Sequence, residues 1–102
     1  MEVIKTDENN FDKVVEKGIT LVDFFSPGCG PCRMLGPILD DAQKETDVQI
    51  VKVNVDESQQ LAMDFGVMVV PTLIVFKDGD PVVKDTGFKT KEQLLDLIDR
   101  AK

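Results

Sequence analysis

The chain alternates between two hydrophobic patterns. Near-continuous apolar runs at 19–25, 49–55 and 72–77 are typical of strands buried on both faces of a sheet. Between these runs, apolar residues recur at helical spacing and charged residues lie on the opposite face. The clearest such set is Leu35, Ile38, Leu39 and Ala42. The pattern predicts strands that alternate with amphipathic helices.

Shorter signals complete the order of the elements. They predict a strand at 3–4, helices at 11–15, 30–46 and 61–65, a strand at 82–86 and a last helix from Thr90. Asn9 or Asn10 is expected to cap the first helix, and Gln93 forms a capping box with Thr90. The run Asp78-Gly79-Asp80 indicates a hairpin. The order β-α-β-α-β-α-β-β-α predicts one α/β domain over 1–102, with helices on both faces of a mixed sheet.

Composition narrows the classes of partner. Of the 102 residues, 42% are hydrophobic and 30% are charged, which suits one folded domain. The net charge of −7 repels phosphate backbones, so we expect no nucleic acid as a partner. The longest weakly polar stretch, 66–76, is too short to cross a bilayer, and the N-terminus resembles no secretory signal. We therefore expect a cytoplasmic protein with no membrane contact.

Histidine is absent from the chain. Its absence excludes Ser-His-Asp and Cys-His mechanisms within one chain. Two cysteines alone cannot supply the four ligands of an ordinary zinc site, so we expect no metal. Cys29 and Cys32 are therefore the main candidates for chemistry.

The run Cys29-Gly30-Pro31-Cys32 follows a predicted buried strand and opens a predicted helix. A helix N-terminus carries partial positive charge and free N–H groups, which would stabilise a thiolate at Cys29 and lower its pKa. Pro31 falls in the first turn, where its missing N–H costs little. Cys32 lies one turn further on, within disulfide reach. The pattern favours a redox pair in which Cys29 attacks a substrate disulfide and Cys32 resolves the mixed disulfide.

Three other interpretations of the cysteine pair are weaker. A structural disulfide that closes so short a loop constrains the unfolded chain little. A zinc or iron–sulfur site would need two chains that each supply two cysteines. A c-type haem site has histidine after the second cysteine, whereas this chain has Arg33.

Two further residues are candidates because of their positions. Asp23 is the only acid in the run 19–25, so burial should raise the pKa of its carboxyl, which could then exchange a proton with Cys32. The alternative is a strand-end acid that reaches water. Pro71 precedes a strand, where a proline is ordinary, and a cis bond before it is the rarer alternative. Between Gly18 and Leu39 only Asp23 and Arg33 are charged, which predicts a weakly charged surface for docking protein substrates.

Seven stretches carry a recognisable pattern: Val22-Asp23-Phe24-Phe25, Cys29-Gly30-Pro31-Cys32-Arg33-Met34-Leu35, Gly36-Pro37-Ile38-Leu39, Lys52-Val53-Asn54-Val55-Asp56, Phe65-Gly66-Val67, Val70-Pro71-Thr72 and Gly87. In this order and at this spacing, they resemble the thioredoxin family, and the resemblance covers the whole chain. The resemblance implies a five-stranded central sheet of order 1-3-2-4-5, flanked by four helices.

The resemblance also implies roles for individual residues. Cys29 would be the attacking thiol, Cys32 the resolving thiol and Asp23 the buried proton acceptor, with Lys52 beside that acid. Pro71 would follow a cis peptide bond. The residues implied to contact substrate are Gly28, Gly30, Pro31, Val70, Pro71 and Gly87.

As a family member, the chain would be a protein-disulfide reductase and general electron carrier. It would work as a monomer with a redox-active disulfide and no bound cofactor. Its partners would be disulfide-bearing proteins and a flavin-containing thioredoxin reductase. The competing classes are a non-catalytic interaction module, which would not need Cys29, Cys32, Asp23 and Pro71 together, and a disulfide oxidase or isomerase.

Two positions depart from the family pattern. The family usually has tryptophan immediately before the first cysteine, where this chain has Gly28, and a second tryptophan where it has Phe25. Loss of the first tryptophan removes an apolar wall beside Cys29 and adds backbone freedom. We expect this departure to change substrate range, redox potential and choice of reductase rather than the chemistry.

Overall fold

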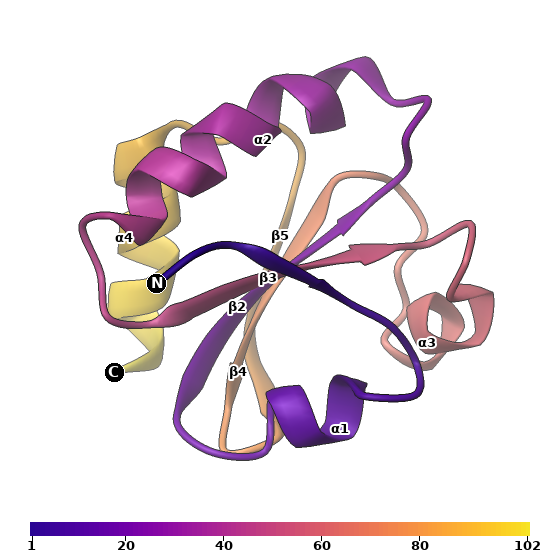
Figure 1. The fold of residues 1–102 in the computed structure, drawn as a ribbon, viewed down its shortest axis with the longest axis horizontal. Helices are drawn as coiled ribbons and strands as arrows, with labels where there is room; N and C mark the ends of the chain where they lie inside the picture. The colour runs from indigo at the N-terminus through magenta and orange to yellow at the C-terminus, as the bar shows by residue number, and fades with distance from the viewer.

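A five-stranded sheet with two helices on each face forms the protein in the computed structural model, which describes residues 1–102 (Figure 1). In chain order the elements are β1 (Ile4–Thr6), α1 (Phe11–Val14), β2 (Ile19–Phe25), α2 (Gly30–Gln43), β3 (Gln49–Asn54), α3 (Gln59–Asp64), β4 (Thr72–Lys77), β5 (Asp80–Thr86) and α4 (Lys91–Ala101). The strand order is β1-β3-β2-β4-β5; β1, β3 and β2 are parallel, and β4 and β5 run antiparallel to their neighbours. The α/β class, the element order and the strand order expected from the sequence are confirmed.

The sheet separates two hydrophobic clusters of different chemistry. Helices α2 and α4 cover an aliphatic cluster on one face, made of leucine, isoleucine, valine and alanine side chains around Leu21 of β2. Helices α1 and α3 cover the other face, where Phe11, Phe24, Phe65 and Phe76 form a phenylalanine cluster with ring centroids 5.1–6.4 Å apart. Because side chains alternate along a strand, Asp23 shares the face of Leu21, under α2.

The boundaries of several elements differ from those predicted. Helix α2 ends at Gln43 rather than at 46, because the N–H groups of Lys44 and Glu45 bond to carbonyls three residues earlier and the buried Gln43 side chain bonds to the following loop. Its Nε2 donates to the carbonyls of Val48 (2.8 Å) and Thr46 (3.3 Å), and its Oε1 accepts from the N–H of Ile50 (2.9 Å). One side chain therefore connects the end of α2 to the start of β3.

The short elements near the N-terminus also differ from the prediction. Strand β1 covers Ile4–Thr6 instead of 3–4, since its extent is set by pairing with β3 at Val51–Val53. Helix α1 is a single turn. Asn10 occupies its N-cap position, but its side chain makes no capping bond; the Asp7 carbonyl accepts from the N–H groups of Asn10 and Phe11 instead.

The C-terminal hairpin and helix show how local turn chemistry sets boundaries. Asp78 and Gly79 both have positive φ (51° and 88°), as in a two-residue type I′ turn, so β5 already begins at Asp80. The capping box of α4 is confirmed: the Thr90 hydroxyl accepts from the N–H of Gln93 (3.2 Å), and the Gln93 side chain accepts from the N–H of Thr90 (2.9 Å). None of the four helices has the length and apolar character needed to span a bilayer.

Candidate active site

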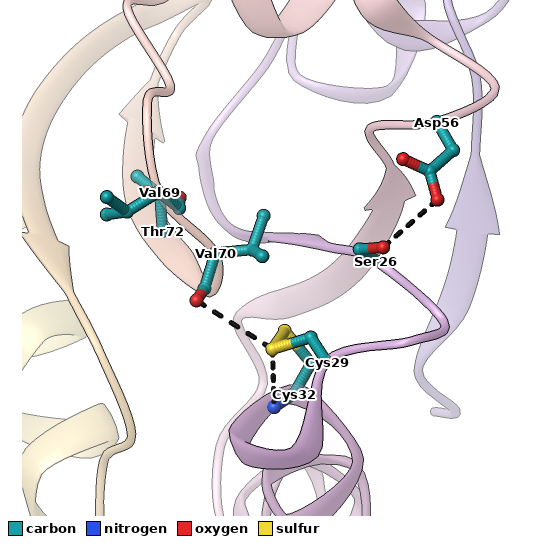
Figure 2. Close-up of a disulfide and its surroundings, with 7 residues drawn as sticks. All are labelled: Ser26, Cys29, Cys32, Asp56, Val69, Val70 and Thr72. Atoms are coloured by element: carbon teal, nitrogen blue, oxygen red, sulfur yellow. Dashed lines mark hydrogen bonds between the residues drawn. A yellow bond between two sulfur atoms is a disulfide. The ribbon is translucent and has the colours of Figure 1, made fainter.

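Cys29 and Cys32 form a disulfide at the N-terminus of α2, directly after β2 and its turn (Figure 2). Their Cα atoms are 5.2 Å apart. Cys29 is the N-cap residue and is half-buried, and its Sγ accepts from the N–H of Cys32 at 3.2 Å. Cys32 is only 3% exposed. The helix start therefore presents one sulfur to solvent and shields the other.

The start of α2 favours negative charge on Cys29. Pro31 lies in its first turn, where a missing N–H is tolerated, and no acidic side chain lies in that turn. The positive end of the helix macrodipole and the N–H of Cys32 both face the Cys29 sulfur. In the reduced form these groups would stabilise a thiolate, the species that attacks disulfides.

A second segment, the loop before β4, approaches the same sulfur. The Val70 carbonyl oxygen lies 3.7 Å from Cys29 Sγ (Figure 2). The Val70–Pro71 bond is cis. The Pro71 carbonyl accepts from the N–H of Gly87 (2.8 Å), and the Thr72 hydroxyl donates to the Val69 carbonyl (2.6 Å). The N–H of Val70 has no partner within the protein. The cis bond at Pro71 is confirmed, and an unpaired backbone donor lies beside the disulfide.

Asp23 is fully buried on the α2 face of the sheet, and neither of its carboxylate oxygens has a hydrogen-bond partner. Burial raises the pKa of this carboxyl to about 7, and the positive charge of Lys52 opposes part of that rise. Lys52 is its register partner on β3. The expected burial and raised pKa of Asp23 are confirmed, and the strand-end alternative is wrong.

The Lys52 ammonium lies under the start of α2. Its Nζ is 4.5 Å from the centroid of the Phe25 ring, and it would lie 3.9 Å from a Cβ built on Gly36. Such a distance to the ring is within the range of a cation–π contact. Phe25 therefore contacts the same ammonium whose charge acts on Asp23.

Glycines leave part of the surface around Cys29 without side chains. Gly28 and Gly30 are exposed, and a Cβ at either position would have no neighbour within 4 Å. Gly87 adopts φ +87°, a conformation that favours glycine, next to the Pro71 carbonyl. The residues implied to contact substrate therefore lie on three segments: the turn and first residues of α2, the loop before β4 and the residue after β5.

Three features near the disulfide were not expected from the sequence. Met68 (92% exposed) and Val69 (54% exposed) extend the apolar surface along the loop before Pro71. The signal available in the sequence was that these two apolar residues lie outside any predicted strand. The Ser26 hydroxyl donates to the Asp56 carboxylate (3.0 Å), beside the motif (Figure 2). Ser26 and Asp56 closely follow the ends of two neighbouring parallel strands. That position in the sequence was the signal that could have predicted their contact.

No group of three or more Cys, Asp or Glu side chains is arranged to hold a metal ion. The two cysteines are instead bonded to each other, and the chain has no free cysteine in this structure. The chemistry that this arrangement offers is therefore the making and breaking of a sulfur–sulfur bond.

Comparisons with known proteins agree with this arrangement. The family model described as Thioredoxin matches residues 2–100. The chain is 44% identical to the thioredoxin of Staphylococcus haemolyticus and 45% identical to that of Staphylococcus aureus, over 98% of each chain. A solved structure of a point mutant of thioredoxin from Halobacterium salinarum superposes with a TM-score of 0.88 and 35% identity, covering 96% of this chain and 88% of that one. A half-exposed and a buried cysteine at a helix start, a cis-proline loop and this full-length similarity together show that the chain belongs to the thioredoxin family.

Proposed function

We propose that the chain reduces disulfides in other proteins and so carries electrons between a reductase and its targets. The observation that supports this proposal most directly is the asymmetry of the pair: Cys29 is half-buried at the helix start, whereas Cys32 is buried behind it. Such a pair can attack an external disulfide with one sulfur and close on itself with the other.

The first step is attack by Cys29. Its thiolate displaces one sulfur of the target disulfide, forming a mixed disulfide between Cys29 and the target and releasing one target thiolate. In the second step the Cys32 thiolate attacks Cys29 Sγ, which releases the second target thiolate. The target has gained two electrons, and the chain holds the Cys29–Cys32 disulfide.

Asp23 would accept the Cys32 proton in the second step. A carboxyl with a pKa of about 7 is partly ionised near neutral pH, so it can take up and return a proton there. The chain contains no histidine to do this. The Lys52 charge opposes the effect of burial on the Asp23 pKa and keeps it near that range.

The target would bind as an extended segment beside Cys29. The Val70 N–H is unpaired, and the Val70 carbonyl has no hydrogen-bonding neighbour other than Cys29 Sγ, so the Val70 backbone can bond another chain once the sulfur is engaged. The target segment would lie between two parts of the chain. Gly28, Gly30 and Pro31 would border it on one side, and Pro71 and Gly87 on the other. The absence of side chains at the glycines lets a target backbone approach closely.

The Cys29–Cys32 disulfide must be reduced again after each cycle. We propose a flavin-containing thioredoxin reductase as the electron donor, with no cofactor bound to the chain itself. Reducing work of this kind belongs in a compartment that keeps thiols reduced, so we place the monomeric protein in the cytoplasm. Its acidic surface disfavours nucleic acid as a partner.

Trapping variants test the assignment of the two sulfurs. Cys32→Ser should accumulate mixed disulfides with target proteins, seen on non-reducing gels, whereas Cys29→Ser should form none. Adducts from Cys29→Ser instead would reverse the roles. The reduction potential tests the direction of electron flow: a value of about −270 mV indicates a reductase, and one of about −120 mV indicates an oxidant.

A further inference from the structure

Residues 26–28, which precede Cys29, have few connections to the rest of the protein. Pro27 and Gly28 are exposed, and Gly28 has no side chain to pack against the protein. Within the turn, the N–H of Cys29 donates to the Ser26 carbonyl at 3.2 Å. Across residues 26–28, the single hydrogen bond to another part of the chain is Ser26 Oγ–H to Asp56 Oδ2, at 3.0 Å (Figure 2).

Asp56 is a firm anchor for that bond. The N–H of Val55 donates to the Phe25 carbonyl (2.8 Å), which extends the β2–β3 ladder to the residues just before Ser26 and Asp56. The N–H of Asp56 donates to Asn54 Oδ1 (2.9 Å), so the side chain of Asn54 fixes the Asp56 backbone. The Ser26–Asp56 bond is thus the next connection after the last rung of the ladder.

We propose that Ser26 and Asp56 are positioning residues, whose hydrogen bond holds the 26–29 turn so that Cys29 Sγ stays at the N-terminus of α2 and beside Val70. This inference rests on the proposed role of Cys29 as the attacking thiol. The connection runs from Asp56 to the Ser26 hydroxyl, and from the Ser26 carbonyl to the Cys29 N–H.

The Ser26–Asp56 bond accounts for how a turn containing Gly28 can still present a well-placed sulfur. A thiolate at Cys29 gains stability from the Cys32 N–H and the helix dipole only while Sγ remains within reach of them. Without the Ser26–Asp56 bond, residues 26–28 are held only through the strand before them and the helix after them, so Gly28 allows more backbone movement and Sγ spends less time there. We therefore expect a higher pKa for Cys29 in the reduced protein and slower attack on every disulfide.

A set of variants separates positioning from general stability. Ser26→Ala and Asp56→Ala remove the bond from either end, and the double variant removes both groups. Ser26→Thr keeps a hydroxyl and should restore wild-type behaviour. Gln60→Ala is the matched control, because it removes another exposed bond to a carboxylate, Gln60 Nε2–H to Asp64 Oδ1 at 2.9 Å, on α3.

The measurements are the ultraviolet titration of the Cys29 thiolate and the rate of reduced protein with a small disulfide. A small reagent makes the rate independent of target docking. Each single variant should raise the pKa of Cys29 and react about three- to tenfold more slowly at neutral pH, the range expected from loss of one hydrogen bond. The double variant should be no slower than the singles, because both substitutions break one bond.

Wild-type pKa and rate in both single variants, additive losses in the double variant, or equal losses in Gln60→Ala would overturn the inference. A different result would contradict the proposed function: a wild-type protein that reduces no disulfide, or that forms no Cys29 adduct as Cys32→Ser. An active wild type with unaffected Ser26 variants refutes the positioning role alone.

Discussion

Replacing Asp23 by asparagine should stabilise the fold by an amount that grows with pH. The folded pKa of this carboxyl is about 7, whereas an unburied aspartate has a pKa of 3.8. Between these values the unfolded chain has released the proton and the folded chain retains it, so stability falls as pH rises. Above about pH 7 the carboxylate is charged in both states, and the full desolvation penalty acts on the folded one.

The size of the effect follows from the two pKa values. Their difference of roughly three units corresponds to a penalty of about 4 kcal/mol at pH 8. At pH 4 the penalty is below about 1 kcal/mol, since the buried acid is neutral and its unfolded counterpart is about half ionised. Asparagine is neutral at both pH values, so its own burial cancels in the comparison. The gain from Asp23→Asn should be about 3 kcal/mol larger at pH 8 than at pH 4.

Guanidinium melts of the oxidised protein at pH 4 and pH 8 measure this difference. Asp40→Asn is the control, because Asp40 is exposed on α2 and its carboxylate remains in water in both states. Its substitution should change stability by nearly the same amount at the two pH values. An Asp23→Asn gain that is equal or smaller at pH 8 would refute the desolvation argument. The variant should also resolve mixed disulfides more slowly near neutral pH, which stopped-flow reduction of a target would show.

Two further substitutions test other parts of the site, and a third tests a contact between β5 and the end of α3. Gly28→Trp should slow reaction with a small aromatic disulfide, because the ring would cover Cys29, and should change kcat/KM ratios among insulin and two unrelated reductases; unchanged ratios would indicate a neutral difference. Met68→Ser should lower kcat/KM for protein targets about three- to tenfold while sparing a small disulfide, since a flexible, 92% exposed apolar side chain suits docking. Met63→Ser, which removes a 72% exposed methionine on α3, is its control, and equal losses would contradict a docking role. Lys84→Met should lower the unfolding free energy by about 1 kcal/mol, because Lys84 Nζ donates to the Phe65 and Gly66 carbonyls (3.1 and 3.0 Å); calorimetry showing no fall in Tm would contradict it.

The sequence predicted best those features that depend on neighbours along the chain. Strand β2 and the start of α2 follow from an apolar run that ends at Pro27 and Gly28. The burial of Asp23 follows from its place inside that run. The capping box of Thr90 and Gln93 is likewise a local signal that needs no partner from elsewhere in the fold.

Features that depend on contacts between distant segments could not be predicted from such local signals. The Gln43 side chain at the end of α2 bonds to the loop before β3 and to Ile50 of β3, and the extent of β1 is set by its register with β3. The cis bond at Pro71 was expected only through the family resemblance, because the local sequence favours a trans bond. The Ser26–Asp56 bond depends on two strand ends that meet only in the folded sheet.

The two hydrophobic clusters differ in their aromatic content, and this difference gives each cluster its own signal in NMR. Phe11, Phe24, Phe65 and Phe76 all lie under α1 and α3, so ring currents shift methyl resonances such as those of Val22 and Ile74 in that cluster. The aliphatic cluster under α2 and α4 contains no ring, so its methyl resonances are shifted only where they lie close to the Phe25 ring on the same face. Methyl spectra recorded during reduction would therefore show separately whether the α2 face, which carries Cys32, loosens while the phenylalanine face stays packed.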